Sequence, residues 1–168
     1  MVKRVYTRKE VAGLLEALER QARESTSLAK QAEAAAARDS FEAYNAFRNK
    51  VGEFRALCIL VEGRLRSLET GSADEVRERY AQLDTLMLSL LVRASMRFFF
   101  VLSAKTVLPL GAREIFVTEL RSLYDASEKL RQPEYANRLN ESIRTELETA
   151  EAILEEIIDK APSMLQFT

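Results

Sequence analysis

The residues with the clearest chemical potential are Ser89, Arg93 and Arg97, which follow one another at intervals of four residues. At about 100° per residue, this spacing places one hydroxyl and two guanidinium groups on a single stripe of a helix. The sequence contains no Asp or Glu between Asp84 and Glu114, so neither arginine has an acid nearby in the chain. Two planar guanidinium groups side by side suit the carboxylate or phosphate of an anionic small molecule.

A structural role for the same arginines competes with this ligand-binding hypothesis. Arginines on a mostly buried helix commonly take carboxylates from neighbouring helices, because an unpaired buried charge is too costly. Lys105 and Arg113 belong to the same acid-free stretch and raise the same question. We favour the structural role and keep an anion site at Ser89, Arg93 and Arg97 as the alternative.

Three consecutive aromatic residues, Phe98, Phe99 and Phe100, raise the possibility of a contact surface. Consecutive helical residues are about 100° apart, so the three rings span about 200° and cannot share one core-facing stripe. At least one ring must enter a second contact, either within the chain or with a second subunit. The C-terminal Met164, Leu165 and Phe167 could join such an interface.

Composition excludes many kinds of catalytic and metal site. The chain has no His and one Cys, Cys58, which removes histidine-based zinc sites, Ser-His-Asp catalysis and an internal disulfide. Cys58 lies on an apolar helical seam and is interpreted as a core residue. The sequence has no phosphate-binding glycine loop, nucleophile elbow or calcium loop. We therefore predict no catalytic residues, no metal and no cofactor, and an enzyme is the less favoured class.

Charge argues against a nucleic-acid partner, because a formal net charge of -1 provides no general basic field. The N-terminal tip is locally basic through Lys3, Arg4, Arg8 and Lys9. The segment 134–160 has an excess of acids. Two solvated surfaces of opposite sign are the favoured interpretation, with a contact between them as the alternative.

A membrane role is also disfavoured. The most apolar stretch, residues 86–110, is long enough to cross a bilayer but contains Arg93, Arg97 and Lys105. Each of these cations would cost about 2.5 to 3.5 kcal/mol at membrane depth. The stretch therefore predicts a buried central helix. The first ten residues contain no apolar signal segment, and with the lone Cys they favour a cytoplasmic protein.

Apolar residues recur with helical spacing along almost the whole chain, and strand-like alternation is missing. Thr7 with Glu10 has the pattern of a capping box, and Pro133 suits a helical first turn. The expected fold is an all-α, antiparallel, up-and-down bundle of four to five helices, three of them long. It forms one domain over residues 1–168, with helices near 8–37, 40–69, 73–106, 112–131 and 134–160.

The first two predicted helices could form a hairpin or one continuous rod, because no Gly or Pro separates them. The apolar stripe shifts phase near Asp39. A fold-back there would set small residues against large ones, which favours the hairpin. The small residues are Ala22, Ser25, Ala29, Ala32 and Ala36, and the large ones are Phe41, Tyr44, Phe47, Val51 and Phe54.

The sequence therefore predicts a non-enzymatic cytoplasmic bundle that acts through a protein partner or as a homo-oligomer. The alternative is a ligand-binding or sensory module that holds an anionic small molecule.

Overall fold

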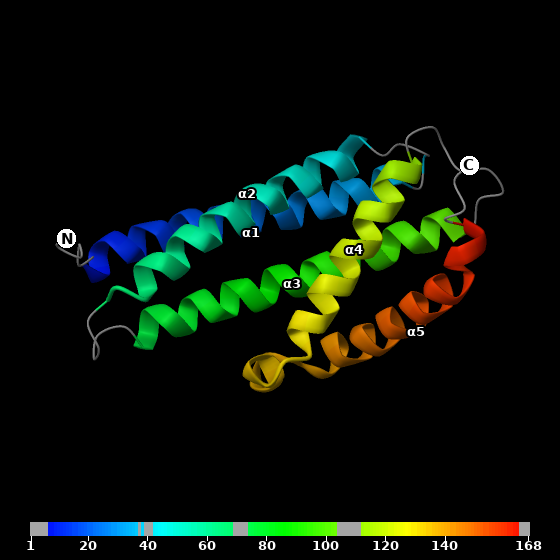
Figure 1. Ribbon diagram of the computed structural model, residues 1–168. Helices are drawn as coiled ribbons and strands as arrows, with labels where there is room; N and C mark the ends of the chain where they lie inside the picture. Colours follow the sequence, from blue (N-terminus) through cyan, green and yellow to red (C-terminus); the bar gives the residue numbers. More distant parts are fainter. Residues whose placement is uncertain (1–6, 37, 39–41, 69–73, 104–111, 165–168) are drawn as a thin grey trace. The chain divides into compact units, whose positions relative to one another are not determined.

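The protein is all-α throughout the part of the chain that the structure, a computed structural model, describes (Figure 1). The described residues are 7–36, 38, 42–68, 74–103 and 112–164, and among them the side chains of 36, 102–103, 112–115, 158 and 160–164 are left undescribed. The elements are α1 (Arg8–Ala36), α2 (Glu42–Leu65), α3 (Asp74–Ser103), α4 (Ala112–Leu130), the short 3-10 helix η1 (Pro133–Arg138) and α5 (Glu141–Met164). The predicted all-α helical bundle is confirmed.

The chain divides into two compact units, residues 1–87 and 88–168. Helix α3 is continuous across this division, so its first part belongs to unit 1 and its second part to unit 2. The single domain expected over residues 1–168 stays a prediction, and each unit is described by itself.

In unit 1, α1 and α2 lie side by side and run in opposite directions, so the chain forms the hairpin and not a continuous rod (Figure 1). The capping box at the start of α1 is formed as predicted. The Thr7 amide donates to Glu10 Oε2 at 2.8 Å, and the Glu10 amide donates to Thr7 Oγ1 at 3.3 Å. Small residues of α1 and large residues of α2 are buried in this unit, namely Ala22, Ser25 and Ala32 and Tyr44, Phe47, Val51 and Phe54.

The first part of α3 is tied to both helices of the hairpin by polar contacts. Arg79 pairs with Glu19 of α1, which holds the pKa of the Glu19 carboxyl below its ordinary value, with a further contribution from Arg23. On the other side, the Tyr80 hydroxyl donates to Glu62 Oε1 of α2 at 2.6 Å. Burial, and next the hydrogen bond to Glu62, raises the pKa of Tyr80. These contacts hold three helices together in unit 1.

Unit 2 contains the second part of α3 together with α4, η1 and α5. The Ser95 hydroxyl of α3 donates to Glu119 Oε2 of α4 at 2.9 Å, and Glu119 is 1% exposed. An edge-to-face contact joins the rings of Phe99 and Phe116, whose centroids are 5.2 Å apart. At the end of α4, the Arg131 guanidinium donates to the Leu147 carbonyl oxygen of α5 at 3.3 Å. Both α3 and α5 are therefore connected to α4.

The last predicted helix, near 134–160, differs from the structure at its start. Pro133 begins the 3-10 helix η1, and Leu139 after it has an extended backbone, with φ -85° and ψ 123°. Helix α5 then begins at Glu141, where Asn140 Oδ1 accepts a 2.9 Å hydrogen bond from the Ile143 amide. The Asn140 side chain satisfies one of the free amides of the first turn, so the α-helix starts there and not at Pro133.

Among the helices described, none combines the length and apolar character needed to span a bilayer. In the apolar stretch from residue 86, the described part of α3 buries Leu88, Leu91 and Val92.

Candidate functional site

The stripe of Ser89, Arg93 and Arg97 on α3 is divided between the core and the surface of unit 2. Ser89 is buried, whereas Arg93 and Arg97 are exposed. The three side chains therefore do not line one open face, although their spacing along α3 is as the sequence predicts.

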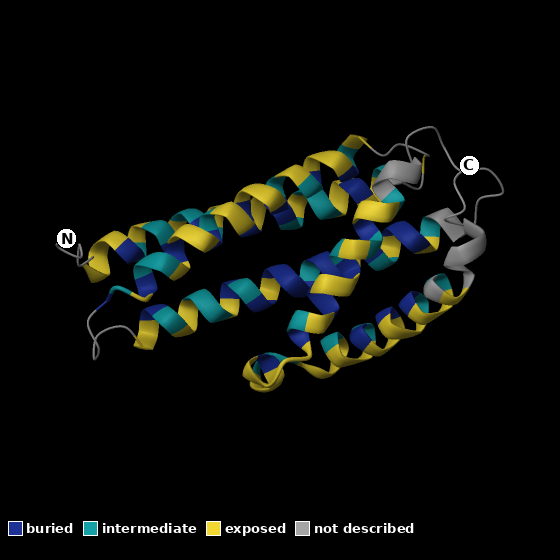
Figure 2. Ribbon diagram, in the orientation of Figure 1, coloured by how far each residue is buried: buried dark blue, intermediate teal, exposed yellow. Residues whose placement is uncertain are grey.

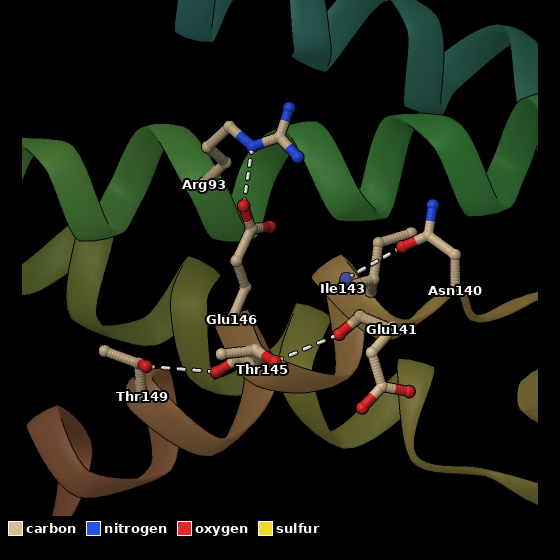
Figure 3. A network of polar contacts seen from close by, with 7 residues as sticks. All are labelled: Arg93, Asn140, Glu141, Ile143, Thr145, Glu146 and Thr149. Atoms are coloured by element: carbon tan, nitrogen blue, oxygen red, sulfur yellow. Dashed lines mark hydrogen bonds and ion pairs between the residues drawn. The ribbon is translucent and has the colours of Figure 1, made fainter.

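The guanidinium of Arg93 meets a carboxylate of another helix (Figure 3). Arg93 Nε donates to Glu146 Oε1 of α5 at 2.9 Å. The Arg93 side chain is 51% exposed and that of Glu146 is 21% exposed, so the ion pair is partly open to solvent. The second oxygen, Glu146 Oε2, is buried and accepts no hydrogen bond.

Helix α5 positions Glu146 through local hydrogen bonds in its first turns (Figure 3). Asn140 caps the helix, and the Thr145 hydroxyl donates to the Glu141 carbonyl oxygen at 3.0 Å. One turn later, the Thr149 hydroxyl donates to the Thr145 carbonyl oxygen, also at 3.0 Å. These contacts fix the start of α5 and, with it, the position of the carboxylate opposite Arg93.

The Arg93–Glu146 pair agrees with the structural role that we favoured for this arginine. Glu146 could not be identified as the partner from the sequence, because it is one of eight acids between residues 134 and 159. Lys105 and the side chain of Arg113 lie outside the described residues. The anion site at Ser89, Arg93 and Arg97 stays a prediction.

The side chains of the three consecutive phenylalanines point in different directions from α3, as their helical spacing requires. Phe98 and Phe99 are buried, whereas Phe100 is 71% exposed. Only Phe100 of the three can therefore reach a partner without repacking unit 2. The other predicted interface residues, Met164, Leu165 and Phe167, lie outside the described side chains.

A second exposed apolar group lies on α2. It is separate from the core seam of this helix, whose buried residues are Tyr44, Phe47, Val51, Phe54, Cys58, Val61 and Leu65. Ile59 is 71% exposed and its neighbour Leu60 is half exposed. Figure 2 shows exposed residues along α2 between its buried ones. The side of α2 that points away from its buried residues carries Gly52, Ala56 and Gly63 beside Ile59.

The sequence contained a signal for this second surface. Asn45, Asn49, Gly52, Ala56, Ile59 and Gly63 follow one another at alternating intervals of four and three residues. The core seam of α2 has the same spacing but larger apolar side chains, so its pattern in the sequence is stronger than that of the second surface.

Across the described side chains, no group of three or more Cys, Asp or Glu residues is placed to hold a metal ion. Comparison of the chain with protein-family models, curated proteins and solved structures finds no match.

Proposed function

We propose that this chain is a non-enzymatic cytoplasmic helical protein that acts by contacting another protein through exposed apolar side chains of its helices. The observation that supports this proposal is the 71% exposure of two large apolar residues, Ile59 in unit 1 and Phe100 in unit 2. Single exposed apolar residues are common on protein surfaces, but grouped ones mark contact sites.

Each unit also exposes other apolar side chains. Leu60 follows Ile59 on α2, and unit 2 also exposes Val117 and Tyr124 on α4. The aromatic side chains among them are of the types that dominate binding energy at protein interfaces. A cytoplasmic location fits Cys58, the one cysteine of the sequence, which is buried, because a reducing compartment keeps cysteines as thiols.

Photo-crosslinking in living cells tests the proposal. A benzophenone amino acid replaces Ile59 or Phe100 in the full chain, and irradiation joins it to any protein in contact. Ala34 on α1 and Ala152 on α5 are exposed, one in each unit, and serve as matched control positions. We expect discrete protein adducts from position 59 or 100 and none from 34 or 152. Equal yields at all four positions, or no adduct at 59 and 100, would refute the proposal.

A further inference from the structure

We infer that the partner at α2 is a second copy of this chain, and that the two α2 helices pair in parallel and in register. This inference rests on the proposed function and names the partner of one of its two surfaces. The contact is made by the outward seam of α2, defined as Asn45, Asn49, Gly52, Ala56, Ile59 and Gly63.

The outward seam has the spacing of a helix-pairing surface. Its intervals of four, three, four, three and four residues are those of the a and d positions of a coiled coil, with Asn49 at a and Gly52 at d. Five of its six residues are exposed and Gly63 is half-buried. None of the six is charged, whereas charged residues occupy seven other positions of α2. The seam is thus an uncharged strip along an otherwise charged helix.

Packing within their own chain does not require the two glycines of the seam. A Cβ atom added at Gly52 or Gly63 would meet no atom within 4 Å. A glycine inside a helix costs about 1 kcal/mol relative to alanine, so each lowers the stability of α2 without easing any contact in this chain. The absence of a side chain at these positions would allow a second helix to approach closely.

The charged residues beside the seam are complementary to those of a second copy in parallel orientation. Arg48 and Glu53 are five residues apart, which is the spacing of the g and e positions that pair across a parallel two-stranded coil. Within one helix they are about 140° apart and cannot meet. In its own chain Glu53 accepts from Lys50 at 2.8 Å, and its side chain is 56% exposed. Arg48 of one copy therefore faces Glu53 of the other, twice by symmetry.

An antiparallel pair of α2 helices is electrostatically less favourable than the parallel pair. In an antiparallel pair, g positions face g positions and e positions face e positions. Arg48 would then meet Glu62, but Arg55 would face Arg55 and Glu53 would face Glu53. Asn49 at an a position further favours the parallel pair, because two such amides hydrogen bond across the interface only when the helices are in register. A net charge of -1 adds little repulsion between two whole copies.

Cysteine crosslinking tests the parallel register. In a Cys58→Ala background, Asn49→Cys, Ala56→Cys and Gly63→Cys are made separately in the full chain and oxidised gently. A parallel pair brings each a position within disulfide reach of its own copy, so all three variants should form covalent dimers. Ser27→Cys, on an exposed face of α1, is the control that should stay monomeric. Dimers from only one of the three seam positions overturn the parallel register.

Charge reversal tests the contact independently by sedimentation equilibrium. Arg48→Glu and Glu53→Arg should each weaken the dimer, and the double variant should recover its affinity. Ile59→Lys should raise the dissociation constant at least about tenfold, because an apolar side chain leaves the interface of each copy. Ala34→Lys adds the same charge on α1 and should leave the constant unchanged. Failure of the double variant to recover would exclude the Arg48–Glu53 pairing.

The inference and the proposed function fail in different ways. If the purified chain is monomeric at every concentration tested and forms no disulfide dimers, the inference is wrong. Adducts with a different protein at position 59 would then still support the proposed function. If benzophenone at 59 and 100 yields no protein adduct, the proposed function is wrong as well.

Discussion

At the residue scale, Arg93 illustrates how a cation in an acid-free stretch finds a carboxylate on another helix. Its partner Glu146 is separated from it by 53 positions in the chain. Both side chains remain partly in contact with solvent, so screening limits the strength of the pair. The buried oxygen Glu146 Oε2 accepts no hydrogen bond, which leaves this carboxylate dependent on Arg93.

We expect Arg93→Ala to lower the free energy of unfolding of the protein by about 1 kcal/mol, near the upper end for exposed ion pairs. The Glu146 carboxylate then loses the hydrogen bond that Arg93 donates, so Arg93→Ala combined with Glu146→Gln should cost less than the two single changes added together. Urea unfolding measures all three variants. Arg121→Ala, at an exposed arginine of α4, is the control and should have little effect. Strict additivity would show that the pair contributes nothing.

Glycines provide a second prediction at this scale. Gly13→Ala, Gly52→Ala and Gly63→Ala should each raise the free energy of unfolding by up to about 1 kcal/mol, because the added methyl group meets no atom within 4 Å. The effect on self-association distinguishes the three variants. Gly52→Ala and Gly63→Ala should weaken the dimer, whereas Gly13→Ala on α1 should not. Chemical denaturation and sedimentation measure the two effects, and identical behaviour of all three variants would argue against the seam.

At the element scale, the start of α5 depends on Asn140. We expect Asn140→Ala to destabilise the protein by about 1 kcal/mol, because the Ile143 amide loses its acceptor. Asn137→Ala, at an exposed position of η1, removes a similar side chain without removing a cap. Thermal unfolding followed by circular dichroism compares the two variants. Equal shifts would mean that Asn140 does not cap α5.

The helices themselves could be predicted from the sequence, because apolar spacing and capping residues are local properties. Thr7 and Glu10 form the predicted capping box, and the hairpin of α1 and α2 followed from matching small residues to large ones. The start of α5 was misjudged because Pro133 suits the first turn of a 3-10 helix as well as that of an α-helix.

The polar partners were not predictable in the same way. Ser95 meets Glu119 and Arg93 meets Glu146 only because separate helices pack together in unit 2, and nothing in the local sequence selects one acid among many. Helical geometry alone predicted that Phe98, Phe99 and Phe100 cannot share one core-facing stripe. Which ring would be exposed depended on the placement of α4, whose Phe116 contacts Phe99.

At the scale of the whole molecule, α3 is the element that belongs to both compact units. Leu86 lies close to the division and is half exposed, so its side chain contributes little to the core. A break in the helix at this position would therefore interrupt the hydrogen-bonded continuity of α3 between the two units without creating a cavity.

We expect Leu86→Pro to convert one calorimetric unfolding transition into two, because proline inside a helix costs about 3 kcal/mol and interrupts its hydrogen bonds. Leu86→Ala keeps the helix intact and is the matched control, which should unfold in one transition. A single transition in both variants would show that the units are coupled by something other than the continuity of α3.

The two seams of α2 face opposite directions, so the side chains that fold the hairpin and those that would meet a partner are different residues. A cell that carries Ile59→Lys should accumulate the protein at its normal level. Any phenotype of that allele would then result from the lost contact and not from a lower protein level. Substitutions on this side of α2 are therefore suited to separation-of-function experiments.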